Sequence, residues 1–279
     1  MSKRILLGCI LVAAVAAAVV VFLDPSRTIL GWWNGESFYK GKPASAWRTA
    51  LLDSAPAART NTMKMMADGK ADAVPVLVEL LDRHGGNNSN EIRWTAADIL
   101  GQIGPDAAAA SGPLGQALTD EDPLVRRVAA EALGKIGPPA REAVPALVAL
   151  LHTEDRLHAV KALIHFKATA REAVPALVVV LKDPSPEIRW NACEALGDMK
   201  SDAKDAAPAL QELLGDRVAK VREHAAEALG EIGPDAKVCL PDLRRLLDDP
   251  DAGVRDEAIK ALRRIDPTSP IPKGGSKSD

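Results

Sequence analysis

An arginine recurs along this chain at a near-constant interval, in similar sequence surroundings each time. The six copies are separated by 33, 30, 33, 33 and 33 residues: Arg93, Arg126, Arg156, Arg189, Arg222 and Arg255. Seven residues after each arginine stands a leucine: Leu100, Leu133, Leu163, Leu196, Leu229 and Leu262. Self-similarity with a period of about 20–50 residues is typical of repeat architectures. One structural unit is therefore predicted to recur along the chain.

The first half of each repeat opens with a proline and continues with an apolar stripe. In one copy Pro145 is followed by Leu147, Leu150 and Leu151, a spacing that places the leucines on one helical face. Proline suits the first turn of a helix, where its missing N–H is not needed and its fixed φ is helical. The equivalent positions are Pro75, Pro145, Pro175, Pro208 and Pro241, and Gly112 beside Pro113 in the remaining repeat. A helix is predicted after each.

The second half of each repeat has the same helical periodicity. Its apolar stripe is illustrated by Val125, Ala129, Ala132, Leu133 and Ile136, spaced i, i+4, i+7, i+8 and i+11. Acidic residues before this apolar face, such as Asp120 and Asp122, are suited to capping the helix N-terminus. Glycine–proline pairs end three copies: Gly104-Pro105, Gly137-Pro138 and Gly233-Pro234. Alanine on the apolar face favours close approach between neighbouring helices.

A single helix pair has too little apolar surface to be stable alone, so repeats of this kind stack on one another. We therefore predict an all-α, right-handed α-solenoid (an alpha-alpha superhelix) of about seven helix pairs over residues 43–266. The first pair, Pro43–Gly69, matches the pattern poorly and is expected to cap the N-terminal end. Residues 267–279 are predicted to form a disordered tail.

The N-terminus has the composition of a membrane-inserting segment. After Lys3 and Arg4, residues 5–23 form 19 consecutive positions without a charge. At about 1.5 Å per residue, such a helix nearly spans a hydrocarbon core of about 30 Å. Residues 1–23 are predicted to be a membrane anchor or signal helix, and the leading positive charges favour a cytoplasmic N-terminus. The repeats would then be extracytoplasmic (periplasmic) on a single-pass protein, or secreted if cleavage follows the A-x-A pattern at Ala14 and Ala16.

Residues 24–42 form an aromatic-rich connector between the apolar segment and the repeats. Its aromatic residues are Trp32, Trp33, Phe38 and Tyr39. Aromatic side chains just beyond a membrane span often lie at the level of the lipid headgroups. They could equally cover the exposed end of the first repeat. The sequence leaves both hypotheses open.

The charge of the repeats disfavours nucleic-acid binding. Residues 43–266 contain 28 basic and 35 acidic side chains, a net charge of −7, whereas nucleic-acid-binding domains need a basic surface. No G-x-S-x-G, Walker or C-x-x-C motif is present. His158 and His165 share a helix face at i, i+7, but a zinc-binding pair is usually spaced i, i+4. We predict no catalytic residue, no cofactor and no metal site.

The segments Val125–Pro138 and Val221–Pro234 share the pattern V-R-x-x-A-A-E-A-L-G-x-I-G-P. This pattern resembles HEAT-like repeats of the phycobilisome-lyase type. The segment from Tyr39 to Pro43, followed by Trp47, is similar to openings of bacterial exported or membrane-anchored HEAT-repeat proteins. The resemblance implies a binding scaffold, with enzymes as a minority.

Two enzyme classes among these relatives define the alternatives. Iron-dependent HEAT-like hydroxylases hold their metal with His-Glu dipeptides, and this sequence has none. Phycobilin lyases share the scaffold but contribute no catalytic motif that can be matched here. A HEAT-like enzyme or a chromophore- or metal-associated protein of the phycobilin-lyase type therefore remains the alternative to a non-catalytic interaction scaffold.

The candidate binding residues follow the six arginines by one position. If the apolar residues face inward, this position points outward on each second helix. The residues are Trp94, Arg127, Leu157, Trp190, Glu223 and Asp256. In related solenoids the second helices line the concave face, and neighbouring helices lie about 8–10 Å apart. We name this predicted row the stripe, and expect a protein or peptide partner to bind along it, because tryptophan and arginine are enriched at binding hot spots. The alternative is that each tryptophan folds onto neighbouring alanines and fills gaps.

The arginines themselves are expected to be structural. Each can reach acids in adjacent turns or the acid five residues further on, as in Asp98, Glu131, Glu194 and Glu227. Such pairs would connect neighbouring repeats, so we do not assign the arginines to a site.

Overall fold

The computed structural model of the protein describes residues 27–83 and 88–268. The apolar segment 5–23 and the chain beyond residue 268 lie outside the described residues. Among the residues that are described, no helix is both long and apolar enough to cross a membrane.

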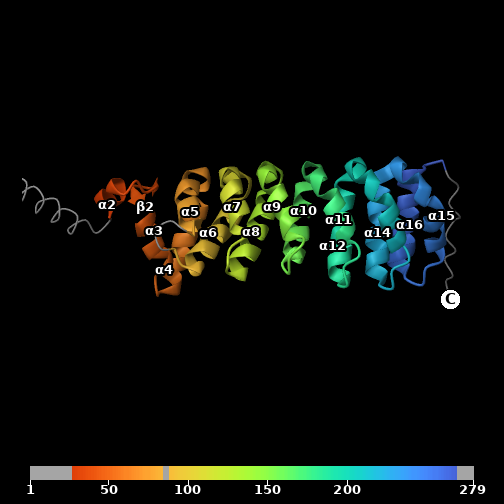
Figure 1. The fold of residues 1–279 in the computed structure, drawn as a ribbon, viewed down its shortest axis with the longest axis horizontal. Coiled ribbons are helices and arrows are strands. Elements are labelled where there is room, and N and C mark those ends of the chain that lie inside the picture. Colours follow the sequence, from red (N-terminus) through yellow and green to blue (C-terminus); the bar gives the residue numbers. More distant parts are fainter. Residues whose placement is uncertain (1–26, 84–87, 269–279) are drawn as a thin grey trace, which may run out of the picture.

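Helices α3 to α16 alternate as the first and second helices of seven pairs, and the pairs stack into an elongated rod (Figure 1). The first helices of the pairs are α3 (Ala44–Leu51), α5 (Val74–Leu81), α7 (Ser111–Ala117), α9 (Val144–Leu150), α11 (Val174–Val180), α13 (Ala207–Leu213) and α15 (Leu240–Arg245). The second helices are α4 (Pro56–Ala67), α6 (Asn90–Ile103), α8 (Pro123–Ile136), α10 (Arg156–Phe166), α12 (Pro186–Asp198), α14 (Ala219–Ile232) and α16 (Ala252–Ile265). The predicted α-solenoid is confirmed.

Short 3-10 helices, which the sequence patterns did not predict, lead into the first helices from α5 onward. They are η1 (Lys70–Ala73), η2 (Gly104–Ala110), η3 (Pro138–Ala143), η4 (Lys167–Ala173), η5 (Lys200–Ala206) and η6 (Gly233–Cys239), with η7 (Leu246–Asp248) after α15. The prolines that recur at the start of the first helices therefore stand within the first two positions of helices that continue a 3-10 turn.

The turn after each second helix requires an unusual backbone conformation. Gly104, Gly137 and Gly233 end their helices with φ of 68°, 69° and 77°, a region that glycine adopts without strain. In other repeats a lysine stands at the equivalent point, and Lys167 and Lys200 have φ of 50° and 54°. The glycine pattern therefore marks only some of the helix ends.

The core runs continuously along the rod. The six leucines that follow the arginines by seven residues are all buried, with at most 1% of their surface exposed. Cys193 and Cys239 are fully buried free thiols and pack as small core residues. Second helices of successive repeats pack directly against each other, with glycine facing alanine at several contacts. The predicted close approach through small residues is confirmed at these contacts.

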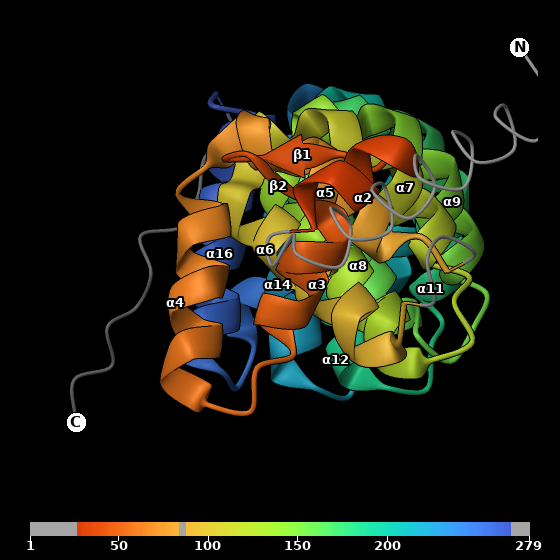
Figure 2. The same ribbon diagram turned by 90° about the vertical axis from the view of Figure 1, so that its left-hand side faces the viewer.

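A small module covers the N-terminal end of the rod (Figure 2). It consists of α2 (Thr28–Trp33) and an antiparallel pair of short strands, β1 (Phe38–Tyr39) and β2 (Lys42–Pro43). The buried Tyr39 ring packs against Trp47 with ring centroids 5.4 Å apart, and its hydroxyl donates to the Met65 carbonyl at 3.2 Å. Tyr39 thus covers the end of the first repeat, whereas Trp32 and Trp33 are 76% and 80% exposed.

Candidate partner-binding surface on the second helices

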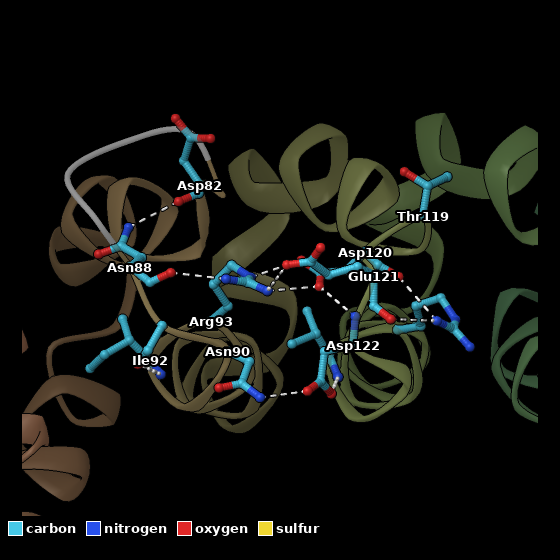
Figure 3. Close-up of polar contacts among 12 residues, drawn as sticks. Asp82, Asn88, Asn90, Ile92, Arg93, Thr119, Asp120, Glu121 and Asp122 are labelled. Atoms are coloured by element: carbon cyan, nitrogen blue, oxygen red, sulfur yellow. Dashed lines mark hydrogen bonds and ion pairs between the residues drawn. The ribbon is translucent and has the colours of Figure 1, made fainter.

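The arginines that define the repeat form a ladder of ion pairs between neighbouring repeats. Arg93 on α6 donates from Nε and Nη2 to the two carboxylate oxygens of Asp120, both at 2.8 Å. Its Nη1 donates to the Asn88 carbonyl at 2.9 Å (Figure 3). The side chains of Arg93 and Asp120 are buried, with 5% and 4% of their surface exposed. Arg93 therefore connects the turn before its own helix to the turn before α8.

The same arrangement recurs along the rod. The further inter-repeat pairs are Arg126–Asp155 at 2.6 Å, Arg156–Asp183 at 2.5 Å, Arg189–Asp216 at 2.9 Å and Arg222–Asp249 at 2.7 Å. Hydrogen bonds from Arg222 hold the pKa of Asp249 below its ordinary value. Arg255, in the last repeat, donates to the carbonyl oxygens of Asp249 and Pro250. Five of the six arginines therefore connect neighbouring repeats in the same way, as the repeat predicted.

The partners of the arginines differ in part from those that the sequence predicted. The acids five residues further on, such as Glu131 and Glu194, are not their partners. The partner is the aspartate in the turn of the following repeat, because the arginine side chain extends across the helix contact rather than along its own helix. The alternative of acids in adjacent turns was the right one.

The repeat that is three residues shorter has a modified rung. There Asp155 accepts from two arginines, Arg126 Nε at 2.6 Å and Arg127 Nε at 2.8 Å. Arg127 belongs to the stripe, and the Asp155 carboxylate raises its pKa above the ordinary value by hydrogen bonding. The Arg127 side chain remains 48% exposed, so the ladder orients it without removing it from solvent.

The six stripe residues lie one on each of α6, α8, α10, α12, α14 and α16. Arg127 and Asp256 are exposed. The other four are half-buried: Trp94, Leu157, Trp190 and Glu223. Trp94 and Leu157 pack partly against the core, so these two side chains stabilise the scaffold as well as presenting surface.

Trp190 has a different environment, formed by the next repeat. The Lys220 ammonium lies over its ring, 3.2 Å from the centroid, and the His224 ring lies 6.1 Å away by centroids. His224 Nδ1 lies 3.1 Å from a Glu227 carboxylate oxygen, and this hydrogen bond raises the pKa of His224 above its ordinary value. Sequence spacing located Trp190 but not Lys220 or His224, since their approach depends on the angle between α12 and α14.

Acidic side chains recur along α14, the helix whose Lys220 contacts the Trp190 ring. Glu223, Glu227 and Glu231 are spaced i, i+4 and i+8 on α14, an arrangement in which like charges disfavour the helix. Two of them are compensated, Glu227 by His224 and Glu231 by Arg264 at 3.0 Å. The electrostatic field at His224 also includes Glu194 of α12 and Glu223. The acidic side chains of α14 are therefore balanced in part by His224 on the same helix and by Arg264 on α16.

The histidines on α10 lie in a shallow hollow between α8 and α10. Its lining includes Lys135, His158, Lys161 and His165. His158 Nδ1 is buried without a hydrogen-bond partner, and burial lowers the pKa of His158. Across residues 27–83 and 88–268, no three His, Cys, Asp or Glu side chains are grouped so as to hold a metal ion.

With this geometry established, comparison with known proteins identifies the repeat. The family model described as HEAT repeats matches residues 88–157, 111–169, 152–230 and 216–273, which together span well over half of the chain. The chain belongs to the HEAT-repeat family. No curated protein matches this HEAT-repeat chain.

Several solved structures resemble this HEAT-repeat protein. An archaeal HEAT-like repeats protein from Thermococcus onnurineus NA1 is 17% identical with a TM-score of 0.58, and the match covers 80% of this chain and 97% of that one. An engineered protein is 25% identical with a TM-score of 0.56, covering 81% of this chain and 68% of that chain. Computationally designed armadillo repeat proteins for modular peptide recognition are 23% identical with a TM-score of 0.54, covering 68% and 99%. These similarities support the helical-repeat fold.

Proposed function

We propose that this HEAT-repeat protein is a non-catalytic, membrane-tethered interaction scaffold that binds a protein or peptide partner along the stripe. The observation that carries this proposal is the alignment of six equivalent positions, one on each of six consecutively packed second helices. Neighbouring helices lie about 8–10 Å apart, and an extended peptide advances about 3.3 Å per residue. Each repeat therefore matches about three residues of an extended segment.

The stripe changes in character along the rod, which suggests the chemistry of its partner. Its first four positions are Trp94, Arg127, Leu157 and Trp190, and its last two are Glu223 and Asp256. We propose a partner segment with apolar side chains at one end and basic side chains at the other. The designed armadillo repeat proteins for peptide recognition, although only 23% identical, are a helical-repeat precedent for such binding.

Substitution of the two stripe tryptophans tests the proposal. A Trp94→Ala/Trp190→Ala variant is compared with the native protein in crosslinking and mass spectrometry from native membranes. We expect the crosslinked partner to be lost while helical circular dichroism is retained. A matched control is Val179→Ala/Val238→Ala, which removes exposed apolar side chains outside the second helices, 64% and 66% exposed. Unchanged crosslinking by the tryptophan variant would refute the stripe as the binding surface.

The tether and the non-catalytic role are tested separately. We propose that residues 5–23 anchor the protein in the cytoplasmic membrane with the repeats on the periplasmic side, so the full chain should resist extraction with carbonate. The phycobilisome-lyase type of HEAT-like repeat would instead predict a bound chromophore or metal. An absorption spectrum and elemental analysis of purified protein would reveal either group, and its presence would favour the enzyme alternative.

A further inference from the structure

Helix α2 presents a pair of exposed tryptophans at the N-terminal end of the rod. Trp32 and Trp33 are 76% and 80% exposed, the highest values among the exposed large apolar side chains of the described residues. Ile29 and Leu30, on the same short helix, are 42% and 36% exposed. Contiguous apolar surface of this kind on a folded domain usually marks a contact with another phase or molecule.

The packing of α2 holds this surface in a defined orientation. Gly31 is the buried residue of the helix, and a Cβ added there would lie 2.3 Å from Pro43 Cβ and 3.3 Å from the Phe38 ring. Only glycine permits this contact, so the Gly31 side of α2 is fixed against the strand pair. Trp32 and Trp33 are exposed as a consequence of that docking. In Figure 1, α2 is the outermost labelled element at its end of the rod.

The charge at this end is opposite to that of the solenoid. Residues 27–48 contain Arg27, Lys40, Lys42 and Arg48 against a single acid, a net charge of +3. That acid, Glu36, accepts a hydrogen bond from the Ser45 amide at 2.7 Å. Residues 49–266, in contrast, contain 27 basic and 35 acidic residues, a net charge of −8. Exposed tryptophan beside lysine and arginine is the composition of segments that lie at anionic lipid headgroups.

The sequence before α2 limits how far this surface can lie from a membrane. The uncharged run ends at Leu23, and α2 begins at Thr28. Five residue steps of extended chain reach at most about 18 Å, at about 3.6 Å each. If residues 5–23 span a bilayer, α2 cannot leave the neighbourhood of the headgroup layer.

We infer that α2 lies in the membrane interface, with Trp32 and Trp33 inserted at the headgroup level, and that it seats the N-terminal end of the solenoid on the bilayer. This inference rests on the proposed membrane tether. It adds that the rod is held by a second contact, at α2, and not by residues 5–23 alone.

Tryptophan fluorescence with brominated lipids tests this contact. The full chain is reconstituted into phosphatidylcholine–phosphatidylglycerol vesicles whose acyl chains are brominated near the headgroup. The spectrum of Trp32 and Trp33 is obtained as the difference between native protein and a Trp32→Phe/Trp33→Phe variant. We expect most of this difference emission to be quenched and blue-shifted. The matched control is Trp94→Phe/Trp190→Phe, which keeps Trp32 and Trp33. The brominated lipids should still quench the emission of this variant, because the replaced residues lie on the solenoid.

The outcomes separate this inference from the proposals on which it rests. Co-sedimentation with vesicles without quenching of the difference emission would overturn the seating of α2 and leave the tether intact. Blue-shifted emission without quenching, together with dimers in analytical ultracentrifugation, would indicate that a second copy of the chain covers the tryptophans, and would also overturn it. Failure to co-sediment would overturn the tether and the seating together.

Discussion

Gly230 of α14 lies so close to α16 that a Cβ added to it would be 2.9 Å from the Cα of Ala261. The contact is between backbones, which cannot move aside as a flexible side chain would. Substitution Gly230→Ala should therefore separate the two helices and lower the free energy of unfolding by about 1–3 kcal/mol. Urea denaturation followed by circular dichroism measures this change.

Gly115 of α7 provides the matched control for that substitution. A Cβ there would be 3.7 Å from the nearest atoms, the Cβ atoms of Ala143 and Ala146, an ordinary van der Waals distance. Gly115→Ala should be neutral or stabilising by about 0.5–1 kcal/mol, since alanine favours helix interiors. Equal effects of the two substitutions would show that the approach of α14 to α16 does not depend on glycine.

Removal of one partner from the buried ion pair between Arg93 and Asp120 should strongly destabilise the protein. Asp120→Ala leaves the Arg93 guanidinium buried without a counter-charge, and we expect a loss of about 3 kcal/mol in the free energy of unfolding. The double variant Arg93→Met/Asp120→Leu should recover part of this loss because it removes both charges. Thermal denaturation of the three proteins provides the comparison.

An exposed ion pair serves as the control for the rung. Lys182 and Glu212 are 3.6 Å apart, and their side chains are 71% and 67% exposed. Glu212→Ala should leave the unfolding midpoint unchanged, because solvent screens such pairs. A comparable loss from Asp120→Ala and Glu212→Ala would contradict the distinct role assigned to the ladder.

Lys167 occupies a conformation that glycine occupies in other repeats. Its φ and ψ are 50° and −140°, whereas Gly137 at the end of α8 has 69° and −142°. A side chain in this region is strained by about 1–3 kcal/mol. Lys167→Gly should thus raise the unfolding temperature, and the reciprocal Gly137→Lys should lower it. Calorimetry of both variants checks the prediction, and a destabilising Lys167→Gly would refute it.

The pair of His224 and Glu227 should make stability depend on pH. Their hydrogen bond raises the pKa of His224 above 6.5 and lowers that of Glu227 below 4.5. The histidine term is fully present below pH 6.5 and is lost as pH rises through the raised pKa. The glutamate term is fully present above pH 4.5 and is lost as pH falls through the lowered pKa. The pair therefore stabilises most between these two values.

A His224→Gln variant tests this dependence. The unfolding temperature of the native protein should exceed that of the variant most at about pH 5.5, and the difference should shrink toward about pH 8. Glu194 and Glu223, which also face His224, should extend the effect to higher pH because both raise its pKa. The exposed His152→Gln provides the control. A difference that stays constant across this range would contradict the assignment.

Periodicity was sufficient to predict the α-helices of the repeats and their core faces, although not the 3-10 helices between them. The leucine seven residues after each arginine is buried in every repeat, because a position on an amphipathic helix is set by its spacing. Asp122 was predicted to cap α8, and its carboxylate accepts from the Leu124 amide at 2.8 Å. Lys167 shows the limit of this logic, since its backbone conformation is imposed by the neighbouring elements and contradicts its own preference.

The stripe was predicted only as a row of positions. That these positions lie on six packed helices follows from the repeat, but the sequence could not distinguish Trp94, which packs partly against the core, from Trp190, whose ring contacts Lys220. Such contacts depend on rotamers and on the angle between α12 and α14. A family-level pattern does not encode either.

The stack of helix pairs could be predicted from the sequence alone, since hydrophobic spacing and repeat length are local properties that leave few alternative folds. Which acid pairs with each arginine depends on how the repeats pack, as with Arg93 and Asp120, 27 residues apart. The burial of Tyr39 and the exposure of Trp32 and Trp33 likewise depend on how the N-terminal module packs on the first repeat. These outcomes depend on the distance and angle between neighbouring elements, which arise when the repeats pack and not from the order of residues within one of them.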